Sequence, residues 1–134
     1  MKMNQVTISA LNVMESAEFY VKLGCKMVVE GDEYARLLAP DGGSTFSLSK
    51  ASEIADASVC HLYFELETVQ ALDEKVAELR SKNFAEFTDP VDKNWLWRES
   101  HVVDPSGFTV ILYHAGGNRL SPPWGVLDKS TAED

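Results

Sequence analysis

The sequence runs twice through the same order of expected elements: one strand, one helix and three short strands. In the first copy, apolar spacing and turn residues predict these elements over 6–10, 13–23, 25–30, 33–39 and 44–50. In the second copy they predict them over 59–65, 69–83, 84–87, 95–103 and 108–114. The copies are in step, because Gln5 and His61 lie 56 positions apart, and so do Asn12 and Thr68. Two copies are too few for a solenoid, so we expect two βαβββ modules that cover each other's apolar faces.

Both predicted helices have recognisable ends. Asn12 places a side-chain oxygen before the first helix, and Glu15 follows three positions later, as in a capping box. Gly24 suits the left-handed conformation that often ends a helix. Thr68 is the corresponding cap of the second helix. The apolar stripe of that helix consists of Val69, Leu72, Val76 and Leu79.

The chain is long enough for one compact domain. It has 134 residues, of which 45% are apolar and 25% are charged, and this composition is typical of a chain that folds alone. We expect a single domain over 1–116, with modules over about 4–52 and 57–115, and a C-terminal tail over 117–134. Trp124 follows two prolines in that tail. We expect it to dock on the domain or on a partner subunit, with a disordered tail as the alternative, because an exposed indole promotes association.

Charge and cysteine usage exclude several classes of partner. Twelve Lys and Arg against 21 Asp and Glu give a net charge of −9, which disfavours binding to nucleic acid or to an anionic membrane surface. No apolar run approaches the ~20 residues of a membrane span. Cys25 and Cys60 each lie inside an apolar segment, which favours reduced core thiols over disulfides or a zinc site. We therefore expect a cytoplasmic protein.

Three short motifs appear in an order and spacing that resemble the vicinal oxygen chelate superfamily. They are Phe19-Tyr20, Leu23-Gly24 and Asp104-Pro105-Ser106-Gly107, and the likeness covers about residues 4–115. That superfamily includes glyoxalase I, bleomycin-resistance proteins and extradiol dioxygenases. The resemblance implies an α+β fold in which two βαβββ modules form a curved, half-barrel mixed sheet with helices outside. It also implies a shared cavity, commonly a homodimer, and, in catalytic members, a divalent metal.

The same resemblance implies four metal-ligand positions, and this chain fills them poorly. They fall at Gln5, Ser47, His61 and Ile111, where the family's metal enzymes carry a carboxylate at the last position. Isoleucine cannot bind a metal, and one imidazole with one amide is a weak donor set for a divalent ion. Glu65, Glu99 or His101 would have to move in to complete it. We therefore expect no full catalytic metal site and no cofactor, with a divalent metal kept as the alternative.

The segment 94–101 is the most distinctive part of the sequence. Alternation along a strand places Trp95, Trp97, Glu99 and His101 on one face. Two indoles with an acid and an imidazole suit a cavity that stacks a flat ligand and orients it through polar groups. The alternative is that the indoles pack under the helices while the charged groups reach solvent.

Further candidates come from the faces that the resemblance directs toward the cavity. Arg36 has Tyr34 on its face and would counter an anionic ligand, or else form a surface ion pair. The predicted ligand-binding residues are Thr7, Arg36, Ser47, His61, Tyr63, Trp95, Trp97, Ile111 and Tyr113. Glu99 and His101 are the candidate catalytic residues.

Three functions are compatible with these features. The first is a homodimeric module that binds a small organic molecule without metal, and the acidic composition suits a cationic ligand. The second is a divergent lyase, isomerase or dioxygenase in which His61 and Glu99 or His101 share the work. The third is a structural role, which requires a filled interior. No phosphate-binding loop, nucleophile elbow or His-Glu-x-x-His motif is present in the sequence.

Overall fold

The computed structural model describes residues 1–127, and they form two compact units. Unit 1 consists of residues 1–60 together with 103–109, and unit 2 consists of residues 61–102 together with those from 110 onward. The two predicted βαβββ modules are confirmed as two helices and two four-stranded sheets. The expected boundary between a domain over 1–116 and a tail from 117 stays a prediction.

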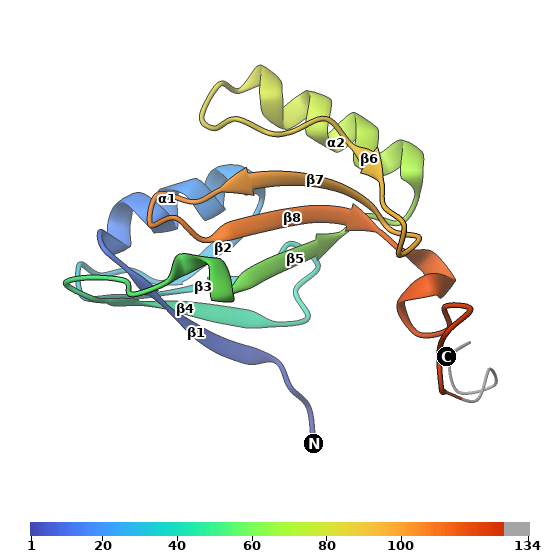
Figure 1. Ribbon diagram of the computed structural model, residues 1–134. Coiled ribbons are helices and arrows are strands. Elements are labelled where there is room, and N and C mark those ends of the chain that lie inside the picture. The colour runs from blue at the N-terminus through green and yellow to red at the C-terminus, as the bar shows by residue number, and fades with distance from the viewer. Residues whose placement is uncertain (128–134) are drawn as a thin grey trace. The chain divides into compact units, whose positions relative to one another are not determined.

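Unit 1 contains a mixed sheet and one helix. Its elements are β1 (Gln5–Ala10), α1 (Val13–Leu23), β2 (Lys26–Val29), β3 (Tyr34–Leu38) and β4 (Thr45–Lys50). The strand order is β1-β4-β3-β2 (Figure 1). β1 runs parallel to β4, whereas β3 is antiparallel to both β4 and β2. A parallel pair needs a long crossover connection, and the helix and the β2–β3 hairpin supply it.

Helix α1 forms where the sequence predicts it. The side chain of Asn12 accepts a hydrogen bond from the backbone of Glu15 at 3.0 Å, and Gly24 takes a φ of 128° at the other end. The helix packs against β2, β3 and β4. Its buried residues are Val13, Ser16, Ala17, Phe19, Tyr20 and Leu23. Burial of this stripe is the main reason why the helix is stable.

The two faces of the first sheet differ in chemistry. The helix side is apolar and includes Ala35, Leu37 and Leu48, each 0% exposed. Strand register places Thr7, Ser47 and Arg36 in one cross-strand row, and alternation directs that row to the opposite face. This face carries the polar candidates of unit 1.

Residues 103–109 complete the core of unit 1. Asp104 is buried and accepts hydrogen bonds from the Tyr20 hydroxyl at 2.7 Å and from the backbone N–H groups of Ser106 and Phe108, both at 2.9 Å. The hydroxyl of Ser106 accepts from the backbone N–H of Leu11 at 3.0 Å. Gly107 closes the turn with a φ of 97°. The Asp-Pro-Ser-Gly motif therefore has a structural role in this unit.

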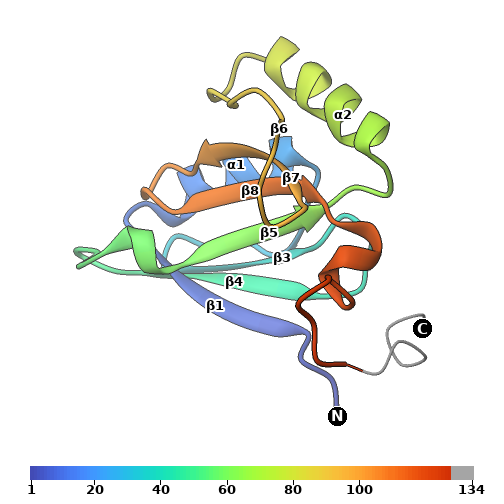
Figure 2. The ribbon, with the colours of Figure 1, turned by 45° about the vertical axis from the view of Figure 1, so that its right-hand side comes forward.

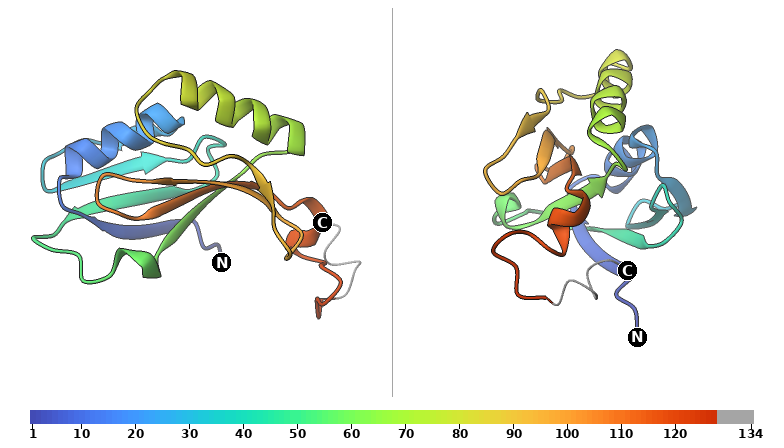
Figure 3. Two further views of the ribbon diagram at one scale, coloured as in Figure 1. Left: turned by 45° about the horizontal axis from the view of Figure 1, so that its top comes forward. Right: turned by 90° about the vertical axis from the view of Figure 1, so that its right-hand side faces the viewer.

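Unit 2 follows the same plan with a shorter edge strand. Its elements are β5 (His61–Glu65), α2 (Val69–Ser81), β6 (Val91–Asp92), β7 (Arg98–Val103) and β8 (Thr109–His114). Figure 2 shows β8 between β5 and β7, in the order β5-β8-β7-β6. The short helices are η1 (Ala57–Val59) in unit 1 and η2 (Gly116–Arg119), which follows β8 in unit 2 (Figure 3).

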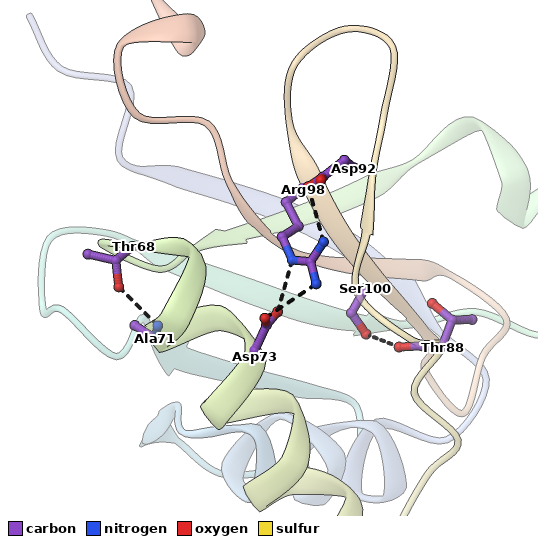
Figure 4. A network of polar contacts seen from close by, with 7 residues as sticks. All are labelled: Thr68, Ala71, Asp73, Thr88, Asp92, Arg98 and Ser100. Atoms are coloured by element: carbon purple, nitrogen blue, oxygen red, sulfur yellow. Dashed lines mark hydrogen bonds and ion pairs between the residues drawn. The ribbon is translucent and has the colours of Figure 1, made fainter.

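Arg98 of β7 connects helix α2 to the second sheet. Its guanidinium donates to Asp73 of α2 at 2.9 and 3.3 Å and to Asp92 of β6 at 3.1 Å (Figure 4). The Ser100 hydroxyl, on the same face, donates to the backbone carbonyl of Thr88 at 2.6 Å. Thr68 caps α2, as expected, by accepting from the backbone N–H of Ala71 at 2.9 Å.

The structure corrects the prediction between α2 and β7. Residues 84–87 do not form a strand, because the carbonyl of Phe87 accepts the Arg80 side chain at 2.7 and 3.1 Å instead of a strand partner. The strand predicted over 95–103 begins only at Arg98, because Leu96 takes a positive φ of 69° inside the β6–β7 turn. Helix α2 ends at Ser81 rather than at Asn83.

The C-terminal segment is described as far as residue 127. Trp124 is 59% exposed, so docking on the surface of its own domain is not what the structure shows. The acidic end over 131–134 lies outside the described residues, as does the rest of the predicted tail from 128 onward. Within residues 1–127, no helix combines the length and hydrophobicity that crossing a membrane requires.

The two cysteines are free, as predicted, but only one belongs to the core. Cys25 is buried, and burial raises the pKa of its thiol to about 12. Cys60 is half-buried, and burial raises its pKa as well, with a smaller contribution from the charge of Asp104. Neither thiol has the lowered pKa of a reactive nucleophile.

Candidate functional site

Three aromatic side chains form a cluster on the second sheet. The Trp97 ring stacks on the Tyr113 ring with centroids 4.7 Å apart and an angle of 23° between the planes. Tyr63 meets both rings edge-on, with centroids at 5.9 Å from Trp97 and 5.5 Å from Tyr113. Tyr113 is buried, whereas Tyr63 is 48% exposed. The cluster therefore has a fixed inner ring and an accessible edge.

A buried carboxylate lies on the same side of β7 as His101. Glu99 is only 3% exposed, and both of its oxygens are occupied. The Trp95 indole donates to Oε2 at 2.7 Å, and Nε2 of His101 lies 2.8 Å from Oε1. A buried carboxylate is costly unless it is hydrogen-bonded, so this arrangement offsets the cost with two partners.

Two tyrosines of the cluster are held in their neutral form. Burial raises the pKa of Tyr63, and the charge of Glu99 adds to the effect. Burial also raises the pKa of Tyr113, with the charge of Glu65 as the next cause. At neutral pH this part of the face therefore offers hydroxyl groups that donate and accept hydrogen bonds.

Glu65 and the segment after β8 support the cluster from one side. Oε2 of Glu65 accepts from the backbone N–H groups of Ala115 at 2.9 Å and Gly116 at 3.1 Å. Nε of Arg119 lies 3.7 Å from the other oxygen, Oε1. The Trp97 indole donates to the carbonyl of Asn118 at 3.5 Å. Asn118 and Arg119 were not among the predicted site residues, because residues beyond Ala115 have no periodicity that would relate them to a strand face.

Two of the residues at family metal-ligand positions lie in unit 2. His61 is exposed at the start of β5, with its ring 6.4 Å from the Tyr63 ring. Ile111 is 2% exposed and belongs to a core cluster with Tyr113 and Ala115, against which Trp97 packs. Ile111 therefore lines the inner side of the aromatic cluster with a hydrocarbon side chain.

The other two positions lie in unit 1, inside a hydrogen-bond network. The side-chain amide of Gln5 makes two hydrogen bonds. Its nitrogen donates to the Ser47 hydroxyl at 2.8 Å, and its oxygen accepts from the Thr45 hydroxyl at 2.5 Å. The hydroxyls of Ser47 and Tyr34 lie 2.5 Å apart. Arg36 donates to the Tyr34 oxygen through Nε at 3.1 Å and through Nη2 at 2.8 Å. Hydrogen bonds from Ser47 and then Arg36 lower the pKa of Tyr34.

This donor set does not fit the divalent metal that the family resemblance implies. In unit 1, Gln5 and Ser47 bind each other and their neighbours, and the charged residue of the network is a cation. In unit 2, the carboxylate position is the hydrocarbon Ile111. Among residues 1–127, no group of three or more His, Cys, Asp or Glu side chains is arranged to hold a metal ion. We derive no chemical step through a metal.

The structure thus gathers the predicted site residues into two groups. Unit 2 holds the eight residues His61, Tyr63, Trp95, Trp97, Glu99, His101, Ile111 and Tyr113. Unit 1 holds Gln5, Thr7, Arg36 and Ser47, joined by Tyr34. Thr7 is exposed beside Ser47 in the cross-strand row. Trp95 and Trp97 precede β7, yet Trp95 reaches Glu99 and Trp97 reaches Tyr113 because the turn brings both back over the sheet.

Comparison with known protein families agrees with this architecture. The family described as the glyoxalase/bleomycin resistance protein/dioxygenase superfamily matches residues 2–112. This chain belongs to that superfamily. The predicted resemblance is thereby confirmed, and it covers both modules of this superfamily member.

Several solved structures share the fold at low sequence identity. A glyoxalase/bleomycin resistance protein/dioxygenase from Nocardioides has a TM-score of 0.75 and 20% identity, over 96% of this chain and 90% of that one. A possible glyoxalase from Bacillus cereus has a TM-score of 0.69 and 21% identity, over 84% and 97%. A bleomycin-binding protein complexed with bleomycin has a TM-score of 0.67 and 17% identity, over 85% and 98%. These identities show the fold alone. Among curated proteins, none matches the sequence significantly.

Proposed function

We propose that this superfamily member binds a small organic molecule on the aromatic face of unit 2 and uses no metal to do so. The observation that carries the proposal is the stack of Trp97 on Tyr113 beside the half-exposed ring of Tyr63. A fixed pair of rings with an accessible third ring suits a flat group, because aromatic surfaces gain most from offset or edge-on contact. Binding without turnover is the expected activity.

The polar groups around the cluster support a ligand with hydrogen-bond donors. Glu99 is buried and orients His101, whose side chain is 36% exposed and can offer its other ring nitrogen to a ligand, and the half-exposed Tyr63 can offer its hydroxyl. The bleomycin-binding protein among the structural neighbours offers a precedent for ligand binding on this fold. We therefore expect an organic molecule that combines a flat ring with an N–H or O–H group.

Native mass spectrometry tests the proposal directly. Protein purified without chelators is exposed to an extract of small molecules, freed of unbound material and measured. We expect wild type to retain one organic molecule per chain and Tyr63→Ser to lose it, because the accessible ring is gone. Trp124→Ser removes an exposed aromatic ring that is not part of the Trp97–Tyr113–Tyr63 cluster and should retain the molecule. Equal retention by Tyr63→Ser, or one transition metal per chain that His61→Ala abolishes, contradicts the proposal.

A second candidate is an enzyme without metal, favoured by the short contact between Glu99 and His101. A carboxylate that orients an imidazole is a common arrangement for proton transfer. Substrate consumption in a screen of cell metabolites would then fall by at least ~100-fold in the Glu99→Gln, His101→Ala double variant, the usual size of a general acid–base contribution. Equal consumption by both proteins removes this candidate.

The proposal includes a homodimer, as the family resemblance implies, and a cytoplasmic location, as the reduced cysteines suggest. Analytical ultracentrifugation measures the mass, which should be twice that of the 14.9 kDa chain. A monomer at micromolar concentration contradicts the dimer and leaves ligand binding by unit 2 to be judged by its own experiment.

A further inference from the structure

Arg36 differs from the other three arginines of the chain. Arg80 pairs with Asp89, Arg98 pairs with Asp73 and Asp92, and Arg119 lies near Glu65. Arg36 has no carboxylate partner among residues 1–127 and donates instead to the neutral hydroxyl of Tyr34. In a chain with 21 acidic residues, an arginine without a carboxylate partner is unexpected.

The hydrogen bonds that Arg36 does make leave one edge of its guanidinium available. Nε and Nη2 both point at the Tyr34 oxygen, at 3.1 and 2.8 Å. A guanidinium carries five N–H groups in one plane, so the edge formed by Nη1 and the second hydrogen of Nη2 remains. Two parallel N–H groups on such an edge match the two oxygens of a carboxylate.

The surrounding network fixes the guanidinium in this orientation. Tyr34 is bonded to Ser47, which is 0% exposed, and Ser47 is in turn bonded to Gln5. The Tyr34 ring also lies under the guanidinium, with its centroid 5.6 Å from Cζ of Arg36. A side chain held before binding loses less entropy when a ligand arrives.

The charge of the first sheet favours an anion. Its four strands contain no Asp or Glu, although the whole chain has a net charge of −9. They do contain Lys26, Arg36 and Lys50, of which Lys50 pairs with Glu33 outside the strands. Charges beyond about 8 Å are largely screened at physiological ionic strength. Within the strands the charged group at the Tyr34–Ser47 network is therefore a cation, which favours an anionic ligand there.

We propose that the free edge of Arg36 binds the carboxylate of a small organic acid on the polar face of the first sheet. The inference goes beyond the proposed function, because it assigns an anion site to unit 1, separate from the aromatic face of unit 2. It replaces the expectation of a cationic ligand, which came from net charge alone. Thr7, exposed in the same cross-strand row, offers a further hydroxyl to the acid.

Three probes of equal shape separate the charge preference from general aromatic binding: benzoate, neutral benzamide and the cation benzamidinium. Each is titrated into the intact protein and followed by proton–nitrogen correlation spectra, which include the Arg36 Nε–H signal. We expect benzoate to shift that signal and to bind more tightly than the other two. Arg36→Gln should weaken benzoate binding at least about tenfold and leave benzamide binding unchanged.

Two further variants make the result specific. Arg36→Lys keeps the positive charge but removes the two parallel N–H groups of the guanidinium. We expect its affinity for benzoate to lie between that of Arg36→Gln and that of wild type. Lys50→Gln removes one positive charge from the same sheet and should change benzoate binding less than about twofold. Equal loss in Lys50→Gln and Arg36→Gln reduces the effect to general electrostatics and overturns the proposal.

The outcomes also separate this inference from the proposed function. If benzoate does not shift Arg36, or if Arg36→Gln leaves benzoate binding intact, the anion site is refuted, while retention of an organic molecule that depends on Tyr63 still supports the proposed function. If benzoate binds through Arg36 while wild type retains no molecule on the aromatic face, the anion site stands and the proposed function fails.

Discussion

The hydroxyl of Tyr20 is the clearest case of a single residue whose role lies in folding. It is buried and donates to Asp104, whose two oxygens together accept three hydrogen bonds. The pKa of Tyr20 is strongly raised, first by burial and then by the charge of Asp104. Both residues belong to motifs that suggested the superfamily, yet here they hold unit 1 together.

Removing that hydroxyl should destabilise the protein measurably. Tyr20→Phe leaves one oxygen of a buried carboxylate without its donor, which costs about 1–3 kcal/mol in the free energy of unfolding. Urea denaturation followed by circular dichroism measures the change. Tyr63→Phe, which alters a half-exposed residue, serves as control and should cost about 0.5 kcal/mol or less. Equal losses would show that Asp104 finds another donor.

Tyr34 should ionise at a lower pH than the other tyrosines. Hydrogen bonds from Ser47 and Arg36 favour its phenolate, whereas burial disfavours the phenolates of Tyr63 and Tyr113. A pH titration of phenolate absorbance should therefore show one early step in wild type. That step should be absent in Tyr34→Phe and displaced to higher pH in Arg36→Gln. An unchanged early step in Tyr34→Phe assigns it to another residue.

Cys25 predicts a loss of stability in alkaline solution. Its thiol keeps its proton up to about pH 12 in the folded chain and loses it near the ordinary value of 9.0 once unfolded. The unfolded state therefore binds fewer protons as the pH rises above about 9, and the free energy of unfolding falls. Urea denaturation between pH 8 and 10 should show a shallower decline for Cys25→Ala than for wild type. Parallel declines would mean that other groups control this range.

At the scale of elements, the sequence predicted helices better than strands. Asn12 and Thr68 cap α1 and α2 as expected, because a cap depends on residues three positions apart. The strand over 84–87 was wrong, since Phe84 and Phe87 pair with each other at 5.7 Å between ring centroids in an irregular segment. Two apolar residues at such spacing do not distinguish a strand from a buried loop.

The candidate site was predictable only in part, because alternation relates residues along one strand but not side chains that meet through rotamers or across elements. Alternation correctly grouped Glu99 with His101 on one face of β7, opposite Arg98 and Ser100. It could not show that the Tyr34 hydroxyl would accept hydrogen bonds from Nε and Nη2 of Arg36, because that contact depends on the rotamers of both side chains. Nor could it relate Asn118 to Trp97, which lie 21 positions apart outside regular strands.

The cap of α2 gives a test at this scale. Thr68→Ala removes the acceptor for the backbone N–H of Ala71 and should cost about 1 kcal/mol in the free energy of unfolding. Hydrogen exchange should quicken mainly in the first turn of α2. Thr68→Ser keeps the oxygen and should restore most of the stability. A loss of similar size in Thr68→Ser would attribute the effect to the threonine methyl group instead.

At the scale of the whole molecule, the two sheets reuse one topology for different chemistry. The polar face of the first presents Arg36 with hydroxyl and amide groups, whereas the second presents aromatic rings around a buried carboxylate. The net charge of −9 does not describe the first sheet, because its strands contain no acid at all. Ligand preference is therefore better inferred from local side chains than from composition.

The segment 103–109 belongs to unit 1 although most of a helix–strand repeat separates it from that unit along the chain. A fragment truncated after Cys60 would thus lack the acceptor of Tyr20 and the hydroxyl that receives the Leu11 N–H. The half-length polypeptide should fail to fold by itself, and adding a peptide that spans 103–109 should help it. The first repeat therefore depends for its buried hydrogen bonds on a turn that the second repeat supplies.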